Sequence, residues 1–260
     1  MSRLIYPDFP HPIDLLPVSL RRAFEDHVLH QYRFGVTGPI ASGKSHVCAK
    51  LVQRFTLLGI PCLHVSYDAL TRELYAAKTM EAEYARFRIA SLLGRDTQNA
   101  DGTMNRQAMA KRLFDSDDGE ALIPEVERIV APHVFRMERE RLAGFRGLVL
   151  VESATLIERG MLRRVGNRVI IVEAHGRDEM LRKRDIDPER AANVARRQFT
   201  VDQLVGLARP QIVGDRGGFM TVHANRWCQN HNEADLEIDR TSNWILAAIP
   251  NLKDEIQPLD

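Results

Sequence analysis

The chain has 260 residues, of which 44% are hydrophobic and 27% charged, a composition typical of a folded globular protein rather than a disordered or fibrous one. A formal net charge of +1 provides no general positive field to hold nucleic acid, so nucleic acid is not an expected partner. The cysteines form no CxxC pattern, and prolines interrupt residues 1–17. We therefore expect reduced thiols, no signal peptide, no membrane span and a cytoplasmic location.

The amino-terminal part of the chain predicts an extension followed by a βαβ unit. Residues 1–31 form the expected extension, with a helix in its second half, where apolar residues recur at helical spacing. The segment YRFGVTG then predicts a strand, residues 44–59 predict a helix that a glycine ends, and IPCLHVS predicts a second strand. This order of elements is that of a parallel βαβ unit.

The middle of the chain predicts helices and then two buried strands. The segment NRQAMAKRLFDS predicts a helix with Asn105 as its N-cap. A longer helical stretch runs from Glu120 to Ala143, and Pro132 should kink or divide it. The apolar runs GLVLVES and NRVIIVEA are typical of strands in the middle of a parallel sheet.

The carboxyl-terminal part of the chain predicts fewer regular elements. Residues 177–199 are strongly basic, and the sequence DPE inside them is a good helix start. Residues 206–232 contain several glycines and predict a long irregular loop. The segment ADLEIDRTSNWILAAIP predicts a short strand, a turn and a last helix.

The stretch GPIASGKS, residues 38–45, follows the first predicted strand and matches the pattern GxxxxGK[ST]. Its glycines allow main-chain N–H groups to approach phosphate oxygens, Lys44 would reach the β and γ phosphates, and Ser45 would bind Mg²⁺. Strings typical of GTPases (NKxD) and of ABC-type ATPases (LSGGQ) are not present. The residues expected to contact ATP here are Gly38, Pro39, Ile40, Ala41, Ser42, Gly43, Lys44, Ser45 and His46.

The segment HVSYDALTREL places Asp68 just after the second predicted strand, at the sheet edge where open α/β sheets bind ligands. Together with the phosphate-binding stretch, this segment resembles the dephospho-CoA kinase family, whose second strand ends in DAD with an arginine four residues further on. Asp68 and Arg72 match the second acid and the arginine, whereas Ser66 replaces the first acid.

Other segments extend this resemblance from about residue 32 to residue 250, outside the stretch 206–232. DGTMNRQAMAKRLFDS is close to the family's DGTLNRxALxxxVF, and LVLVESATLIERG, RDIDPERAANVARRQFTVDQL and ADLEIDRTS are similar to later family segments. Some positions depart from the family pattern, mainly on the expected acceptor side: Ala131 replaces a histidine, Ala154 a proline, Glu152 an aspartate and Arg240 an asparagine.

The resemblance implies an α/β fold: a three-layer P-loop kinase fold with a parallel sheet over residues 32–250. Within it, the resemblance implies a helical acceptor-binding subdomain at about 69–143 and an arginine-rich lid at about 177–199, with 206–232 as an insertion and 251–260 as a tail. The implied reaction moves the γ-phosphoryl group of ATP, with Mg²⁺, to the 3′-hydroxyl of dephospho-CoA.

The resemblance also implies roles for single residues. Asp68 would accept or orient the hydroxyl proton, and Glu152 would hold Mg²⁺ through a water molecule. Arg72 and Arg106 would contact the acceptor. Lys44 and two lid arginines would neutralise charge on the phosphoryl group during transfer, the lid arginines being Arg184 and Arg190.

Plainer interpretations stay open at each position. Asp68 could only cap a helix, Glu152 could only end a strand, and Arg106 could form a surface ion pair. The basic segment could be an ordinary solvated helix face. For the whole chain, the alternatives are a kinase for another nucleotide or small hydroxyl compound, and an ATP-binding module without catalysis.

Overall fold

The computed structural model divides into two compact units, of which the second spans Tyr67–Gly144. The predicted helix before residue 31, the basic segment 177–198 and the tail 251–260 lie outside the described residues. The described residues are 31–116, 118–173, 199–212, 218–223 and 231–249.

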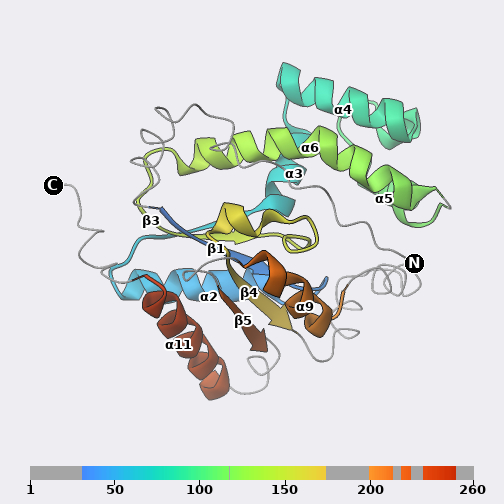
Figure 1. Ribbon diagram of the computed structural model, residues 1–260. Helices are drawn as coiled ribbons and strands as arrows, with labels where there is room; N and C mark the ends of the chain where they lie inside the picture. Colours follow the sequence, from blue (N-terminus) through green and yellow to red (C-terminus); the bar gives the residue numbers. More distant parts are fainter. Residues whose placement is uncertain (1–30, 117, 174–198, 213–217, 224–230, 250–260) are drawn as a thin grey trace, which may run out of the picture. The chain divides into compact units, whose positions relative to one another are not determined.

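The first unit contains a five-stranded sheet in the order β2-β3-β1-β4-β5, with every pair of neighbouring strands parallel (Figure 1). Every residue of β3 is buried, as its continuous apolar run predicts for a central strand of a parallel sheet. The strands are β1 (Gln31–Thr37), β2 (Cys62–Ser66), β3 (Gly147–Glu152), β4 (Arg168–Glu173) and β5 (Gly218–His223).

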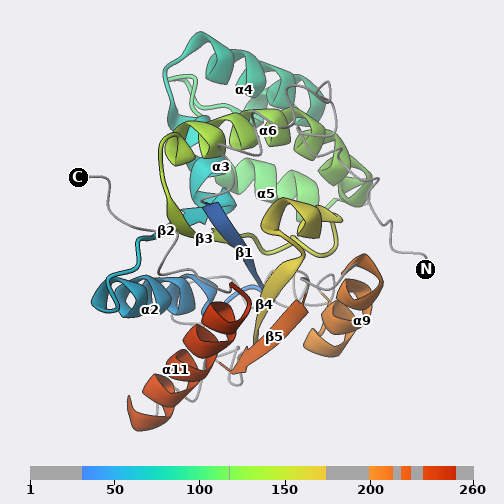
Figure 2. The same ribbon diagram turned by 60° about the vertical axis from the view of Figure 1, so that its left-hand side comes forward.

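Helices α2 (Lys44–Leu57) and α11 (His231–Ala247) pack together against one face of this sheet (Figure 2). Side chains alternate across a strand, so every second residue of the central strands points toward these helices. The resulting hydrophobic core includes Phe34, Val36, Leu148, Leu150, Ile170, Val172, Val47, Leu51, Phe55, Ile238 and Ile245.

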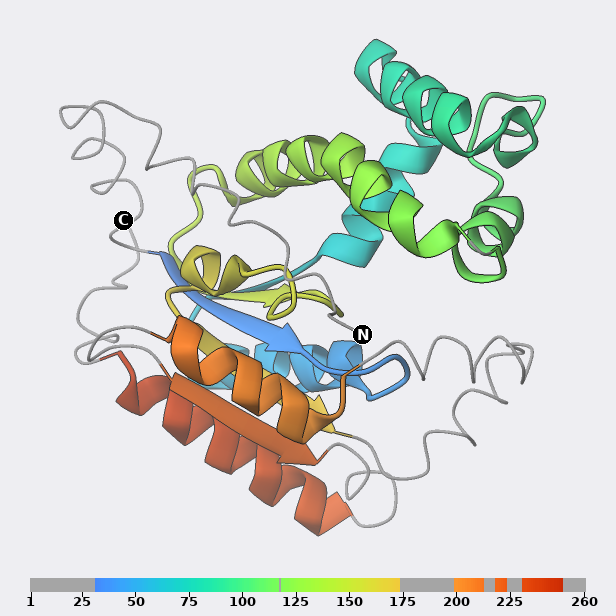
Figure 3. The ribbon, with the colours of Figure 1, turned by 45° about the vertical axis from the view of Figure 1, so that its right-hand side comes forward.

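The other face of the sheet is covered by the short helix η3 (Met161–Val165) and by α9 (Val201–Gln211), which contacts β4 (Figure 3). A Cβ atom on Gly35 of β1 would lie 2.8 Å from Leu156 Cδ2 and 3.0 Å from Val165 Cγ2, so a larger residue there would require these side chains to move. The first unit is therefore an α/β structure of three layers, which agrees with the predicted fold class.

The prediction of an irregular loop at 206–232 was wrong for the described residues of that range, and residues 213–217 and 224–230 lie outside them. Helix α9 continues to Gln211, and residues 218–223 form the edge strand β5, whose pairing with β4 supplies its hydrogen bonds. The prediction of a short strand in ADLEIDRTS was also wrong, because this segment lies within α11. Ile238, Ile245 and Ile249 are buried at helical spacing, and this favours the helix over the short apolar alternation that resembled a strand.

The second unit is helical and is organised around its longest helix. Helix α6 (Gly119–Leu142) contacts α3 (Tyr67–Ala76), α4 (Met80–Leu93) and α5 (Arg106–Phe114). It runs without a break through Pro132, although a division was one of the predicted outcomes there. Among the described residues, no helix is both long and apolar enough to cross a membrane.

A buried arginine holds the second unit together. Arg86 on α4 is only 3% exposed and donates hydrogen bonds to the carbonyl oxygens of Leu74 (3.1 Å), Ala77 (2.5 Å) and Gly102 (2.7 Å). These carbonyls belong to the end of α3, the link after it and the turn before α5. One charged side chain therefore donates to three backbone carbonyls, and the Gly102 carbonyl also accepts from Gln98 Nε2 at 3.0 Å.

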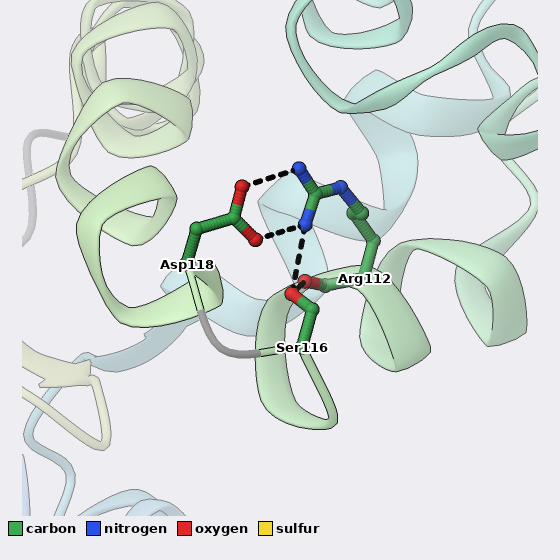
Figure 4. A network of polar contacts seen from close by, with 3 residues as sticks. All are labelled: Arg112, Ser116 and Asp118. Carbon is green, nitrogen blue, oxygen red and sulfur yellow. Dashed lines mark hydrogen bonds and ion pairs between the residues drawn. The ribbon is translucent and has the colours of Figure 1, made fainter.

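A polar network joins the end of α5 to the start of α6 (Figure 4). The Arg112 guanidinium binds both carboxylate oxygens of Asp118 and donates to Ser116 Oγ at 2.8 Å. The hydrogen bond from Arg112 is the main reason that the pKa of Asp118 falls from 3.8 to about 2. Both side chains reach solvent, so the network orients the connection more than it stabilises the fold.

Candidate active site

The predicted phosphate-binding loop lies between β1 and α2, and its backbone is unusual. Gly38 has φ 143°, and a Cβ atom there would lie 2.2 Å from the carbonyl oxygen of Val172 on β4, so only glycine fits. Ala41 has φ 60°, a conformation that residues other than glycine rarely adopt. Gly43, with φ 88°, turns the chain directly into α2. This geometry curls Pro39, Ile40, Ala41 and Ser42 over the helix start.

The amino terminus of α2 is suited to an anion. Gly43 provides no side-chain cap, and the first turn of the helix contains no acidic residue. The partial positive charge of the helix dipole is therefore not neutralised by a carboxylate of its own first turn. His46 is exposed in this turn, and burial of part of its ring, together with Lys50, lowers its pKa.

Lys44 lies folded against the loop. Its Nζ donates hydrogen bonds to the carbonyl oxygens of Gly38 (3.0 Å) and Pro39 (2.8 Å), and the residue is 7% exposed. These two carbonyls hold the ammonium group beside the space that the loop encloses. The first residue of α2 thus brings a positive charge to the predicted phosphate position.

Ser45, Glu152 and His64 form a chain of hydrogen bonds beside Lys44. Ser45 Oγ donates to Glu152 Oε1 at 2.7 Å, and Glu152 Oε2 lies 2.8 Å from His64 Nε2. The register of the sheet explains the position of the acid, because Glu152 is paired with Val36, one residue from the end of β1. The carboxyl end of β3 therefore places its acid beside the phosphate-binding loop.

The electrostatics keep Glu152 ionised although it is only 4% exposed. Burial alone would raise its pKa, but the hydrogen bonds from His64 and Ser45 and the electrostatic attraction to His64 and Lys44 outweigh burial and lower the pKa. A buried carboxylate beside a serine hydroxyl is a pair of hard oxygen donors. This donor set fits Mg²⁺ in its chemistry, because that ion prefers oxygen ligands.

Three residues of the predicted acceptor side belong to the helical unit. Asp68 lies in the first turn of α3, two residues after the end of β2, and its side chain is exposed. Arg72, one turn later and also exposed, donates from Nε to the backbone oxygen of Asp68 at 3.2 Å. Arg106 is the first residue of α5, directly after the confirmed N-cap Asn105, whose side chain accepts from Ala108 N.

Neither the Asp68 carboxylate nor the Arg106 guanidinium forms an ion pair with another residue in the part of the chain that the structure describes. A cation at the first turn of a helix is unfavourable, because the helix dipole is positive there. The position of Arg106 therefore costs some helix stability. The predicted lid arginines, Arg184 and Arg190, lie outside the described residues.

Motif spacing did not single out His64, which the structure places against Glu152. His64 is paired with Leu150 in the sheet, and Glu152 is two residues further along the same strand, so both side chains point to the α2 face. In the sequence, His64 is visible only as an isolated histidine within an apolar strand. Its contact with Glu152 follows only from the pairing of β2 with β3.

Comparisons with known proteins agree with this geometry. A family model described as dephospho-CoA kinase matches residues 32–214. The chain belongs to the dephospho-CoA kinase family. A dephospho-CoA kinase of Bifidobacterium longum is 32% identical over 112 residues, which cover 42% of this chain and 50% of that protein. A dephospho-CoA kinase of Corynebacterium efficiens is 29% identical over 153 residues, which cover 58% of this chain and 70% of that protein.

A solved structure gives the same result for the fold. The protein TT1252 from Thermus thermophilus matches with a TM-score of 0.61 and 23% identity, over 85% of this chain and 98% of that one. The match to the first curated relative spans only half of that relative's length. The comparisons thus establish the family and the fold.

Proposed function

We propose that the chain transfers the γ-phosphoryl group of ATP to the 3′-hydroxyl of dephospho-CoA. The observation that carries this proposal is the phosphate-binding loop of a dephospho-CoA kinase family member, with Lys44, Ser45 and Glu152 held together at its mouth. Phosphoryl transfer of this kind passes through a loose transition state. Catalysis therefore depends mainly on position and on neutralisation of charge.

The residues of the loop would hold the nucleotide. Backbone N–H groups of residues 40–45, at the loop and the start of α2, would surround the β-phosphate. Lys44 would exchange its two carbonyl partners for phosphate oxygens. Ser45 would release Glu152 and bind Mg²⁺, while Glu152 would accept a hydrogen bond from a water on the ion. The metal ion, when bound, supplies positive charge that neutralises the phosphates.

The residues of the helical unit would hold the acceptor, as the family match implies. Asp68 would accept or orient the proton of the 3′-hydroxyl, so that the oxygen is a better nucleophile for the γ-phosphorus. Arg72 and Arg106 would bind negatively charged groups of the acceptor. Arg184 and Arg190 would contact the transferred phosphoryl group from the predicted lid.

An assay of ADP formation from MgATP tests this proposal. Dephospho-CoA is compared with a panel of nucleosides and nucleoside monophosphates as acceptors. We expect ADP to form with dephospho-CoA and not with the others. ADP formed with a different acceptor would assign the chain to another kinase activity, and binding of ATP without ADP formation would assign it to a non-catalytic module.

A further inference from the structure

Three potential metal ligands converge beside the phosphate-binding loop. They are Cys48 on α2, His64 on β2 and Glu152 at the end of β3, and one ligand atom of each lies within 4.8 Å of those of the other two. All three belong to the first unit, in which α2 covers the face of the sheet to which His64 and Glu152 point. Cys48 lies one turn after Ser45, so its sulfur faces the same strands.

The donor set is sulfur, nitrogen and oxygen, which suits zinc and chemically similar cations and does not suit Mg²⁺. In a tetrahedral zinc site, neighbouring ligand atoms are about 3.3–3.8 Å apart. The widest separation in this group, at most 4.8 Å, would therefore shorten by up to about 1 Å, whereas His64 Nε2 and Glu152 Oε2, now 2.8 Å apart, would move slightly away from each other. Cys48 is fully buried and Glu152 is 4% exposed, while the His64 side chain is 26% exposed and leaves access from solvent.

We propose that Cys48, His64 and Glu152 form a binding site for a thiophilic divalent cation of the zinc class. The cation would replace the hydrogen bond between His64 Nε2 and Glu152 Oε2, which are 2.8 Å apart. It would also displace the proton of the Cys48 thiol, which is released to solvent. A water molecule would complete the fourth position.

The two cation sites would share one carboxylate. Glu152 is the acid assigned above to the Mg²⁺ water, and its other oxygen accepts from Ser45. A zinc-class cation bound to Glu152 would draw this carboxylate toward Cys48 and His64 and away from Ser45. Occupation of the site therefore inhibits phosphoryl transfer, and excess Mg²⁺ relieves the inhibition. The inhibition rests on the proposed function, whereas the binding does not.

A titration of the metal-free full chain with Co²⁺ tests the binding directly, because a cobalt–thiolate bond gives a charge-transfer absorption. We expect one Co²⁺ per chain with this absorption, and Zn²⁺ should displace it. Cys48→Ala should weaken binding by at least about tenfold and remove the absorption. Cys62→Ala is the matched control, since Cys62 is a half-buried thiol on β2 outside the three ligands, and it should retain both.

A second pair of variants tests the site even if Cys48→Ala does not fold. His64→Gln should lower Co²⁺ affinity by about tenfold or more, while His133→Gln in the helical unit should leave it unchanged. Lack of the charge-transfer absorption in the wild type, or an absorption that persists in Cys48→Ala, would overturn the proposal. In the ADP assay, Zn²⁺ should inhibit the wild type more strongly than it inhibits Cys48→Ala, each relative to its own rate without Zn²⁺.

Discussion

The phosphate-binding loop and the helical acceptor region differ in how their polar side chains are held. In the loop region, Lys44, Ser45, Glu152 and His64 are fixed by hydrogen bonds to one another and to backbone carbonyls. In the helical unit, the charged ends of Asp68 and Arg106 are exposed and have no ion-pair partner among the described residues.

This difference indicates a division of tasks within the proposed reaction. Phosphate groups are the same in every nucleotide, so a rigid arrangement set by the sheet and the start of α2 can bind them. An acceptor must be recognised and then released, so its contacts are made by side chains that stay free until it binds. Preorganisation is therefore greatest where charge develops during transfer, which is where it accelerates the reaction most.

The largest effect is expected from Asp68→Asn. Loss of the carboxylate removes the group that accepts or orients the hydroxyl proton, and kcat should fall by a factor on the order of 10² to 10⁴. Asp202→Asn is the matched control, because Asp202 is an exposed acid in the first turn of α9. Nearly full activity of both variants in the ADP assay would mean that Asp68 only interacts favourably with the dipole of α3. A different residue would then have to orient the acceptor hydroxyl.

Lys44→Met tests the phosphate-binding loop, whose polar side chains are held in place by hydrogen bonds. Removal of the ammonium group should lower kcat by about 10² to 10³, the usual cost of removing one donor that stabilises developing charge. Lys50→Met, on the same helix but outside the loop, should change kcat by less than about twofold. A comparable loss in both variants would mean that the effect comes from the helix and not from contact with phosphate.

Arg86→Met tests the stability of the helical unit. The substitution removes three hydrogen bonds to backbone carbonyls, of which only that of Gly102 keeps a second side-chain donor, Gln98 Nε2. We expect the free energy of unfolding to fall by about 2–4 kcal/mol. Arg88→Met, at an exposed position of the same helix, should cost less than about 0.5 kcal/mol. Chemical denaturation measures both values. Equal stability of the two variants would contradict the structural role of Arg86.

The smallest effect concerns Asp118 and pH. Its pKa is lowered from 3.8 to about 2, so its contribution to stability is present above pH 3.8 and is lost as the pH falls through about 2. Asp118→Asn should therefore lower the melting temperature slightly near pH 5 and hardly at all near pH 2. Asp115→Asn, which removes an exposed acid outside the Arg112 network, is the control. If the difference in melting temperature between wild type and Asp118→Asn grew as the pH was lowered, this prediction would be contradicted.

The sequence predicted the position and the glycine-dependent backbone of the loop GPIASGKS well, because local chemistry determines them. The glycines of GPIASGKS are required by positive φ angles and by the close approach of Gly38 to Val172, and these constraints can be read from one short stretch. Asn105 was likewise predicted as an N-cap from its position before a helical pattern, and its side chain accepts from Ala108 N. Elements that satisfy their own hydrogen bonds are predictable one at a time.

Elements that depend on distant partners were predicted poorly. Strand β5 obtains its hydrogen bonds from β4, so nothing within GFMTVH distinguishes it from a loop. The start of α11 was taken for a strand, because its burial depends on packing against α2. His64 was missed for the same reason, since its contact with Glu152 needs the pairing of β2 with β3. In all three cases, contacts with residues distant in the sequence determine the structure.

In the proposed reaction, the γ-phosphoryl group of bound ATP is transferred to the ribose 3′-hydroxyl of dephospho-CoA. Phosphorus NMR of a mixture of the full chain, MgATP and dephospho-CoA measures this directly, with Asp68→Asn as the comparison. We predict a new phosphate-monoester resonance on the acceptor that grows as ATP is consumed and that is strongly delayed with Asp68→Asn. Consumption of ATP to ADP and inorganic phosphate, with dephospho-CoA unchanged, would contradict the account.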